Sequence, residues 1–428
     1  MKRVSVSLCF FAMGIMSKAQ VKVEDIINSK EVERIESTLA SDAMRGRQTF
    51  TPDIERAADF ISSEFKSIGL QTYNNASNYR QEFVMVRPKF ISASATVDGN
   101  LLDTKSVVVV TCQPEITIDQ SSGYEIATIK GGGNIFREAS AFIQANKNTI
   151  VMVDTSYTST FSRLTFLKRA IFKTDKSVIF LLGTQPPHTF TITAKHDIVE
   201  QKLANVVGVL PGKSKKNEFV IFSGHYDHLG VGKPVNNDSI FNGANDDAAG
   251  TTAVIMLAKY FKALGNNERT IIFTAFTAEE IGEYGSQYFS RQLDPSTVVA
   301  MFNIEMIGTD SKWGKNSAYI TGYERTDMGA ILQKNLTGTG FTFYPDPYTE
   351  QNLFYRSDNA SLARVGVPAH TISTAKMDQE PNYHKVSDEI QTLDMDNMAM
   401  IIKSIALSSR GIVAGNETPS RVKVEDLK

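Results

Sequence analysis

One stretch of the chain, Ile221–Gly250, constrains the fold more than any other, because it joins a buried strand to a buried helix through a long polar loop. The stretch begins with an apolar run, and His225 and Asp227 follow directly after it. Two adjacent aspartates come about 20 residues later, before a segment, 251–264, with the apolar spacing of a buried helix. A strand that delivers His and Asp to a loop, with acids at the next helix start, indicates a metal site.

Strands and helices alternate through the chain after residue 204. Apolar runs of strand length occur at 205–210, 218–223, 270–276, 298–304 and 368–372, and helical spacing occurs at 251–264, 282–292, 327–336 and 394–414. Alternation of this kind is typical of strands joined by crossover helices. It predicts an α/β fold, with a mostly parallel mixed sheet sandwiched by helices.

The organisation of the chain follows from shifts in this texture. Residues 20–87 open with a helix at Val21–Leu39 and a second one after Thr51, and we expect them to form the first part of the α/β domain. Residues 88–203 hold many short β-rich runs with one expected helix, Phe161–Phe172, and we interpret them as an inserted β-rich domain. A continuous, enlarged sheet is the alternative. Residues 204–415 complete the α/β domain, and 416–428 are expected to be a frayed polar tail.

The first residues have the pattern of an export signal. Two basic residues precede a short apolar run, and Ser17-Lys18-Ala19 offers small residues around a cleavage point. We therefore expect residues 1–19 to be a signal peptide cleaved near Ala19, and the run is too short to leave a membrane span. Cleavage would leave Cys112 as the one cysteine, which favours a periplasmic or secreted bacterial protein without an intramolecular disulfide. A buried N-terminal strand is the alternative.

Charge composition bears on the partners of the protein. Lys and Arg number 45 against 47 for Asp and Glu, so the chain has no basic excess of the kind that binds nucleic acid. Hydrophobic residues make up 42% of the chain, which is enough for a substantial core. The composition therefore argues against nucleic acid as a partner and for a globular enzyme or binding protein.

Five short motifs fall where strands give way to loops, the edge at which open α/β sheets bind ligands. They are His225-Tyr226-Asp227, Asp246-Asp247, Glu279-Glu280, Glu305 and His384. Each has an ordinary explanation by itself: the aspartates could cap a helix, the glutamates could be a solvated helix start, and the others could be loop residues. Together they supply imidazoles and carboxylates without cysteine, a ligand set suited to Zn²⁺, Co²⁺ or Mn²⁺.

The order of these motifs resembles the co-catalytic di-zinc exopeptidases, a family that includes bacterial leucine aminopeptidases, glutamate carboxypeptidase, the transferrin receptor ectodomain and the glutaminyl cyclases. The matching words are GHYDHLG, NGANDDAAGT, FTAEEIGEYGSQYF, NIEMIG and YHKVSD, and the resemblance covers residues 39–73 and 204–411. The stretch at 149–183, TIVMVDTSYTSTF followed by SVIFLLG, is more loosely similar to the protease-associated domain that some members carry. This resemblance implies a zinc-exopeptidase fold whose two peptidase segments flank that domain.

The resemblance also implies roles for individual residues. His225 would bind one metal and Asp227 would orient it, while Asp246 would bridge two Zn²⁺ ions. Glu280 and His384 would complete the second metal site. Glu279 would be the general base, so that the catalytic set is Glu279 with Asp227 and the substrates are peptides.

Two positions depart from the family pattern. Relatives most often carry Asp where this chain has Glu305, and Glu is still a competent zinc ligand. We therefore keep Glu305 as a ligand of the metal held by His225. Many relatives carry His where this chain has Asn359, whose role stays open.

The resemblance leaves several functions open. The leading one is an exported di-zinc aminopeptidase. A carboxypeptidase or dipeptidase would need a cation aimed at the substrate carboxylate, for which Arg325, Arg356 and Arg364 are candidates. A glutaminyl cyclase uses one zinc on the same scaffold, and a catalytically inactive binding homologue would typically lack ligands. The oligomeric state does not follow from the sequence.

Overall fold

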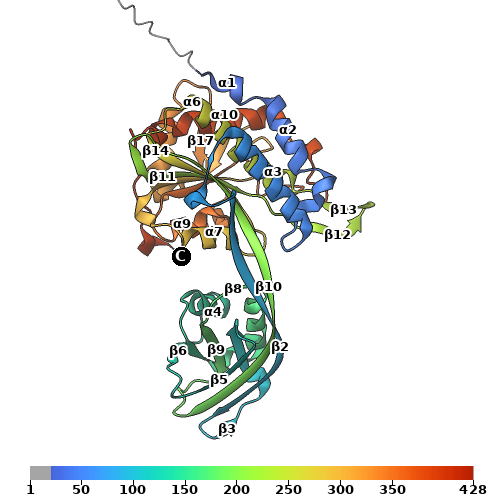
Figure 1. The fold of residues 1–428 in the computed structure, drawn as a ribbon, viewed down its shortest axis with the longest axis vertical. Helices are drawn as coiled ribbons and strands as arrows, with labels where there is room; N and C mark the ends of the chain where they lie inside the picture. Colours follow the sequence, from blue (N-terminus) through green and yellow to red (C-terminus); the bar gives the residue numbers. More distant parts are fainter. Residues whose placement is uncertain (1–20, 428) are drawn as a thin grey trace, which may run out of the picture.

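The computed structural model describes residues 21–427, and these form two lobes joined by a pair of long strands (Figure 1). The signal peptide expected at residues 1–19 lies outside the described residues. Within residues 21–427, no helix combines the length and the apolar character that crossing a membrane requires.

The larger lobe contains a mixed sheet that runs through its centre. Its strands are, in spatial order, β17 (Thr342–Pro345), β16 (Ser317–Ile320), β18 (Ala369–Ser373), β15 (Val298–Ile304), β11 (Lys215–His225), β14 (Arg269–Phe276), β10 (Phe190–Leu210) and β2 (Arg80–Val97). The four strands from β18 to β14 are parallel to one another, whereas β10 and β2 run antiparallel to their neighbours. This is the predicted α/β fold, a mostly parallel mixed sheet between helices, and the prediction is confirmed.

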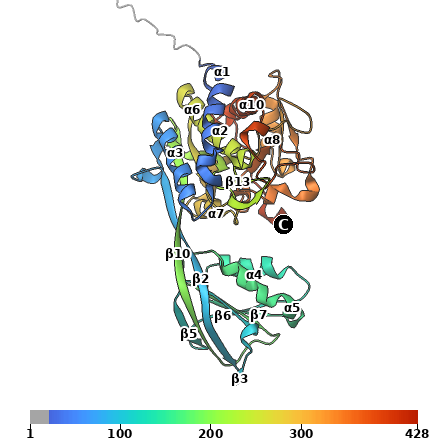
Figure 2. The same ribbon diagram turned by 90° about the vertical axis from the view of Figure 1, so that its right-hand side faces the viewer.

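Helices cover both faces of this sheet (Figures 1 and 2). The larger core lies under α2 (Ser29–Leu39), α3 (Pro52–Ile68), α6 (Ala249–Leu264), α8 (Met328–Asn335) and α10 (Met395–Val413). The opposite face packs on α7 (Tyr284–Ser290) and α9 (Asn359–Ala363). The helix expected at Val21–Leu39 is in fact two, because the chain leaves the helical conformation after α1 (Val23–Ile26) and Asn28 caps α2.

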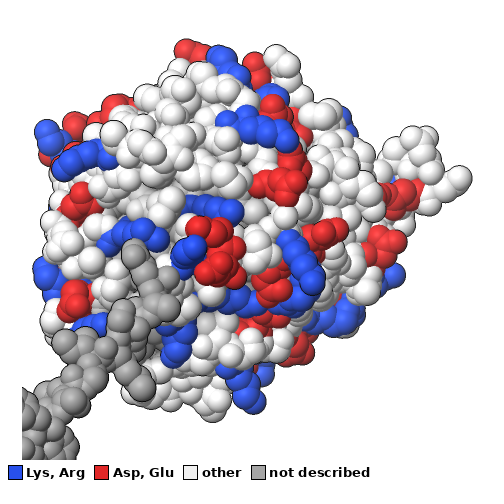
Figure 3. Space-filling model, turned by 90° about the horizontal axis from the view of Figure 1, so that it is seen from above, with Lys and Arg blue, Asp and Glu red and all other residues white. Residues whose placement is uncertain are grey.

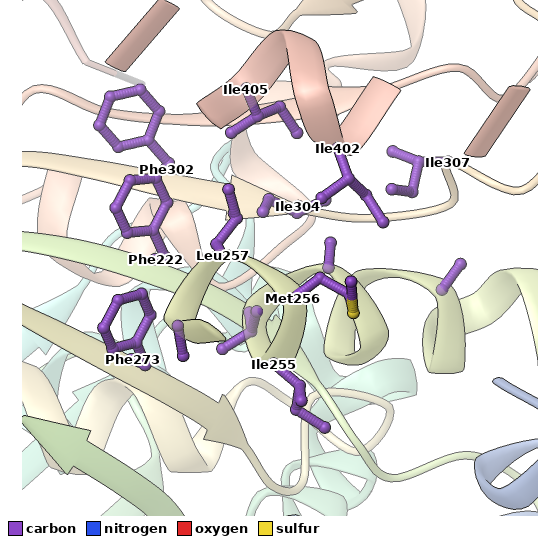
Figure 4. Packing of buried hydrophobic residues seen from close by; sticks show 14 of the residues in the cluster. Phe222, Ile255, Met256, Leu257, Phe273, Phe302, Ile304, Ile307, Ile402 and Ile405 are labelled. Carbon is purple, nitrogen blue, oxygen red and sulfur yellow. The ribbon is translucent and has the colours of Figure 1, made fainter. Parts of the chain in front are cut away.

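Aromatic side chains stack across the three central strands beneath α6 (Figure 4). Phe222 lies between Phe273 and Phe302, with ring centroids 5.8 and 4.8 Å away. Burial of an aromatic side chain of this kind contributes about 1.5–3 kcal/mol. The stack fixes the strands whose carboxyl ends carry the candidate residues.

The smaller lobe consists of the outer halves of β2 and β10 and the chain between them (Figure 2). Strands β3 (Asn100–Leu101), β5 (Glu115–Asp119) and β8 (Ile171–Phe172) extend the large sheet along these two strands. A separate sheet contains β4 (Val107–Thr111), β9 (Ser177–Leu182), β7 (Thr149–Val153) and β6 (Glu125–Ile129), with α4 (Ile135–Gln144) beside it. The expected boundaries at 87/88 and 203/204 fall inside β2 and β10, which continue from one lobe into the other.

The helix predicted at Phe161–Phe172 is wrong. The segment forms the end of α5 (Thr158–Phe161), a 3₁₀ helix at Ser162–Lys168 and then β8. Phe161 and Leu164 are buried with a spacing of three, which a 3₁₀ helix satisfies as well as an α-helix does.

The first helix after the Glu279-Glu280 motif connects the lobes. The Tyr284 hydroxyl of α7 donates to the Ala170 carbonyl at 2.9 Å, and Tyr288 stacks on Phe83 of β2 with centroids 4.6 Å apart. The smaller lobe therefore touches the element that follows two of the candidate residues.

The polar tail after α10 is packed onto the larger lobe. Arg421 donates to the Val298 carbonyl at 2.7 Å, and Val422 is buried. Fraying was expected from the polar composition, and these contacts correct that expectation. Elsewhere the surface carries both signs of charge, which lie close together on the face in Figure 3.

Candidate metal centre

The candidate residues meet at one edge of the sheet because their strands are parallel. His225 is the last residue of β11, and it aligns with Phe276 at the end of β14. Glu279 and Glu280 follow β14, and Glu305 directly follows β15. His384 comes from the loop after β18, the next parallel strand. Five motifs spread over 160 residues of sequence therefore meet at one edge.

Asp246 lies at the centre of the cluster. Its Oδ1 is 3.2 Å from His225 Nε2, and its Oδ2 is 3.2 Å from Nε2 of His384. The two oxygens of one carboxylate thus face two different imidazoles. His225, Asp246 and Glu305 form a first group, whose ligand atoms all lie within 4.8 Å of one another.

A second group shares Asp246. It contains His228, Asp246 and Glu280, again with ligand atoms within 4.8 Å of one another. His384 Nε2 lies 3.1 Å from Glu280 Oε2, so this histidine also contacts the group. The Nδ1 atom of His228 is 2.6 Å from Glu280 Oε1. His228 stands in the word GHYDHLG, but sequence reasoning assigned no role to it.

Glu279 lies beside these groups without belonging to either. Its Oε2 is 3.9 Å from His225 Nε2, and its backbone N–H donates to Asp227 Oδ1 at 3.1 Å. The Glu280 N–H donates to the other Asp227 oxygen at 3.3 Å. The Asp227 carboxylate therefore holds the backbone of both glutamates.

Asp227 contacts His225 in a different way from the one expected. The carboxylate oxygen is 3.9 Å from His225 Nδ1, too far for a hydrogen bond, whereas the Asp227 carbonyl oxygen is 3.1 Å from it. The carbonyl accepts a hydrogen from Nδ1, which leaves Nε2 of the imidazole free to face Asp246. Asp227 thus orients His225 through its backbone.

Three further buried charges hold the loops of the centre. Asp247 accepts from the backbone N–H groups of His225, Gly250 and Met306. Asp388 accepts from the N–H groups of Asn245 and Asp246. The Arg47 guanidinium, fully buried, donates to the carbonyls of Tyr226, Asn242 and Gly243. The Arg-Gly-Arg loop was visible in the sequence, but its distance of 179 residues from Tyr226 concealed the contact.

Backbone conformation marks the same place. Ala278, Met306 and His384 have φ angles of 60°, 52° and 56°, in the left-handed region that residues with a side chain rarely adopt. All three are site residues or their direct neighbours. Local backbone strain of this kind is concentrated at functional sites.

The electrostatics of the cluster favour a bound cation. Burial raises the pKa of Glu305 to about 7 and that of Asp358, whose charge acts on Glu279, to about 8. Burial also raises the pKa of Glu279 well above its ordinary value. Within residues 21–427, Asp246 and Glu280 form ion pairs with histidines alone, and no Lys or Arg pairs with any carboxylate of the two groups. An excess of buried carboxylate is stable when a cation compensates it.

The donor atoms also fit a metal. His225 Nε2, Asp246 Oδ2 and Glu305 Oε2 are all buried and none has a hydrogen-bond partner. Buried polar atoms almost always have a partner, so unpartnered atoms on all three residues of the first group fit a cation-binding site. Imidazole nitrogen and carboxylate oxygen are the donors that zinc takes in catalytic sites.

Asn359, the second departure from the family pattern, does not join the cluster. Its amide donates to the Phe354 carbonyl at 3.0 Å and accepts from the Thr371 hydroxyl at 2.8 Å. These contacts tie α9 to β18. Asn359 thus has a structural role.

Comparison with known proteins identifies the region that carries the centre. Residues 205–408 match the family model described as Peptidase family M28. These residues belong to peptidase family M28. The family resemblance drawn from the five motifs is confirmed, and the M28 region contains every residue of the two groups.

Curated relatives match less than half of the chain. A "Probable leucine aminopeptidase" of Trichophyton verrucosum is 28% identical over 204 residues, which is 45% of this chain and 53% of the relative. A "Leucine aminopeptidase 1" of Ajellomyces dermatitidis is 29% identical over 211 residues, or 45% and 52% of the two chains. The chain spans about half the length of the curated relatives it matches.

Solved structures match nearly the whole chain. The aminopeptidase from Aneurinibacillus sp. strain AM-1 has a TM-score of 0.54 at 16% identity, covering 95% of this chain and 98% of that one. BSAP, a zinc aminopeptidase from Bacillus subtilis, has the same TM-score at 17% identity, covering 94% and 97%. Because the identities are this low, the two matches show that the chain shares a fold with those proteins, and no more.

Proposed function

We propose that the protein is a metal-dependent aminopeptidase that removes N-terminal residues from peptides. The observation that carries this proposal is the Asp246 carboxylate, whose two oxygens face His225 on one side and His384 on the other. A carboxylate placed in this way suits a bridge between two cations. Relatives named as leucine and zinc aminopeptidases support the same activity.

The first ligand set is the first group: His225, Asp246 and Glu305 would hold one Zn²⁺. For the second Zn²⁺, we take Asp246 and Glu280 from the second group together with His384, whose Nε2 contacts both carboxylates. Co²⁺ or Mn²⁺ are the alternatives. Bound zinc would polarise the scissile carbonyl and lower the pKa of a water molecule.

Glu279 is the group that moves the proton. Its carboxylate lies within reach of the first metal group, belongs to neither group, and is fixed through its N–H by Asp227. Oε2 of Glu279 would take a proton from the attacking water and deliver it to the leaving amine. Asp227 would maintain the alignment of that carboxylate with His225.

The proposal also covers the first residues of the chain and the smaller lobe. We propose that residues 1–19 direct export and are removed near Ala19, and that the segment 88–203 is an inserted β-rich domain of the protease-associated type. Sequencing the N-terminus of the protein recovered from a bacterial periplasm tests the first point. A mature protein that begins at Met1 would contradict it.

Metal analysis together with a substrate panel tests the activity. The purified protein should contain about two Zn²⁺ per chain and hydrolyse aminoacyl-p-nitroanilides, and a chelator should abolish the hydrolysis until zinc is restored. N-acetylated substrates are the control, because they lack the free amine. Hydrolysis of acetylated substrates at the same rate would overturn the aminopeptidase assignment. Loss of ammonia from a Gln-initiated peptide without shortening would indicate a glutaminyl cyclase instead.

A further inference from the structure

A small pocket of about 30 Å³ opens beside Glu305, on the side of the first metal group. Its apolar wall is formed by Tyr319, Leu353 and Met377, which pack together as one cluster. Tyr383, whose ring stacks on His384 with centroids 4.0 Å apart, forms another part of the lining. Since the pocket begins at a residue of the metal group, it is within reach of the side chain of the residue being released.

Arg356 is the one cation among the residues that line this pocket. Its side chain is exposed, and the hydrogen bond to Gln351 Oε1 is long, at 3.4 Å. Within residues 21–427, no Asp or Glu lies within ion-pair distance of its guanidinium. By contrast, Arg269 pairs with Glu218, and Arg421 donates to the Val298 carbonyl. Its charge is therefore available to a ligand.

The two other arginines considered for substrate recognition are already engaged. Arg325 donates to the Asp426 carbonyl at 2.9 Å and lies 3.3 Å from Glu324. Arg364 lies 3.6 Å from Glu283, and neither arginine lines the pocket. The structure thus separates three candidates that the sequence could not separate.

Arg356 shares the pocket with one acid of the centre. Glu305 is the one carboxylate in the lining, and a cation held by the first group would neutralise it. The guanidinium would then dominate the field inside a partly apolar pocket, where a charge pair is stronger than in water.

We propose that Arg356 makes this pocket selective for substrates whose N-terminal residue carries a side-chain carboxylate, Asp or Glu. This inference rests on the proposed aminopeptidase function, because it assumes that the first residue of the substrate lies against the metal group. A guanidinium matches a carboxylate with two parallel hydrogen bonds, so it recognises both charge and shape. The apolar wall would contact the methylene groups of that side chain.

A comparison of Glu and Gln substrates isolates the charge, because the two side chains have nearly the same shape. We expect kcat/KM for glutamyl-p-nitroanilide to exceed that for glutaminyl-p-nitroanilide by about tenfold to a hundredfold in the zinc-loaded wild type. Arg356→Gln should reduce this ratio to near one, mainly through KM for the glutamyl substrate. Arg356→Glu should reverse the preference toward lysyl-p-nitroanilide. Arg364→Gln is the matched control and should keep the wild-type ratio.

Each other outcome has a definite meaning. An unchanged Glu/Gln ratio in Arg356→Gln, or an equal loss in Arg364→Gln, overturns the role of Arg356 and leaves the aminopeptidase function standing if neutral substrates are still cleaved. A loss in Arg356→Gln that is confined to dipeptides with a free carboxyl end, and absent for their amides, also overturns the proposal, because the arginine would then bind the carboxyl terminus. Failure of the zinc-loaded wild type to cleave any aminoacyl substrate would overturn the proposed function itself.

Discussion

Replacing Glu279 with Gln tests the proposed general base without changing any proposed metal ligand. Glu279 belongs to neither ligand group, and its N–H, not its carboxylate, contacts Asp227. Glutamine has the same shape, so the substitution removes a proton acceptor and leaves His225, Asp246 and Glu305 in place. General bases contribute about 10²- to 10⁴-fold to rate, which corresponds to roughly 3–5 kcal/mol of activation free energy.

The assay measures kcat on a saturating aminoacyl-p-nitroanilide and the zinc content of the same preparation. We expect Glu279→Gln to reduce kcat by about 10²- to 10⁴-fold while two zinc ions remain bound. Glu283→Gln is the control, because Glu283 is also an acid of the same loop, whose pKa burial raises to about 7, and it pairs with Arg364 outside the centre. A kcat within about threefold of wild type would refute the general-base role. Loss of a zinc ion along with activity would instead show that Glu279 is a ligand.

Three further substitutions test the neighbouring parts of the structure. Glu305→Ala should lower the zinc content from two ions toward one, measured by mass spectrometry after dialysis, and an unchanged content of two would show that Glu305 binds no metal. His228→Phe should weaken zinc binding by about 10- to 100-fold in a competition assay with a chelator, because it removes the contact to Glu280 Oε1; equal affinity would limit His228 to packing. Glu36→Gln should stabilise the protein more at pH 8 than at pH 5. Burial raises the pKa of Glu36 from 4.5 to about 8, so the wild type loses the stability of its protonated side chain over that range, whereas the variant does not. The gap in unfolding free energy between variant and wild type should grow by about 4 kcal/mol, and thermal melts that shift in parallel at both pH values would contradict this.

The sequence predicted the larger lobe well because its strands are buried on both faces. β15 lies at the predicted residues, and β14, α6 and α10 differ by one or two residues at an end. Such strands are continuous apolar runs with clear ends. The long strands β2 and β10 were recognised only in part, because their outer halves carry polar residues on an exposed face. That pattern does not differ from that of a surface loop.

The smaller lobe shows why a β-rich insert and an enlarged sheet were hard to separate. β2 and β10 extend the main sheet into this lobe, where β5 and β8 pair with them. Among the described residues, the second sheet of this lobe shares no strand pair with the first. Each of the two interpretations therefore describes part of the lobe, and sequence could not show that they coexist, because strand pairing is non-local.

A single rule predicted that the site residues meet: parallel strands end at the same edge of a sheet. That rule uses only local information, and it predicted His225, Glu280 and Glu305 from the ends of β11, β14 and β15. It could not find His228, which points back toward Glu280 from within a loop, or Asp358, which lies buried near Glu279. Loop residues have no periodicity that fixes their direction.

The centre depends on backbone contacts as much as on its ligands. Asp388, 142 residues after Asp246, holds that residue by its N–H, while Arg47 holds the carbonyl of Gly243 at the start of the same turn. The Asp388 carboxylate thus holds the backbone N–H of Asp246, and the Arg47 guanidinium holds a carbonyl of the turn before it. Since the Asp246 carboxylate must face two imidazoles at once, a small rotation of this turn would break one of the two contacts. The proposed bridging role of Asp246 would therefore account for a fully buried arginine outside the two groups.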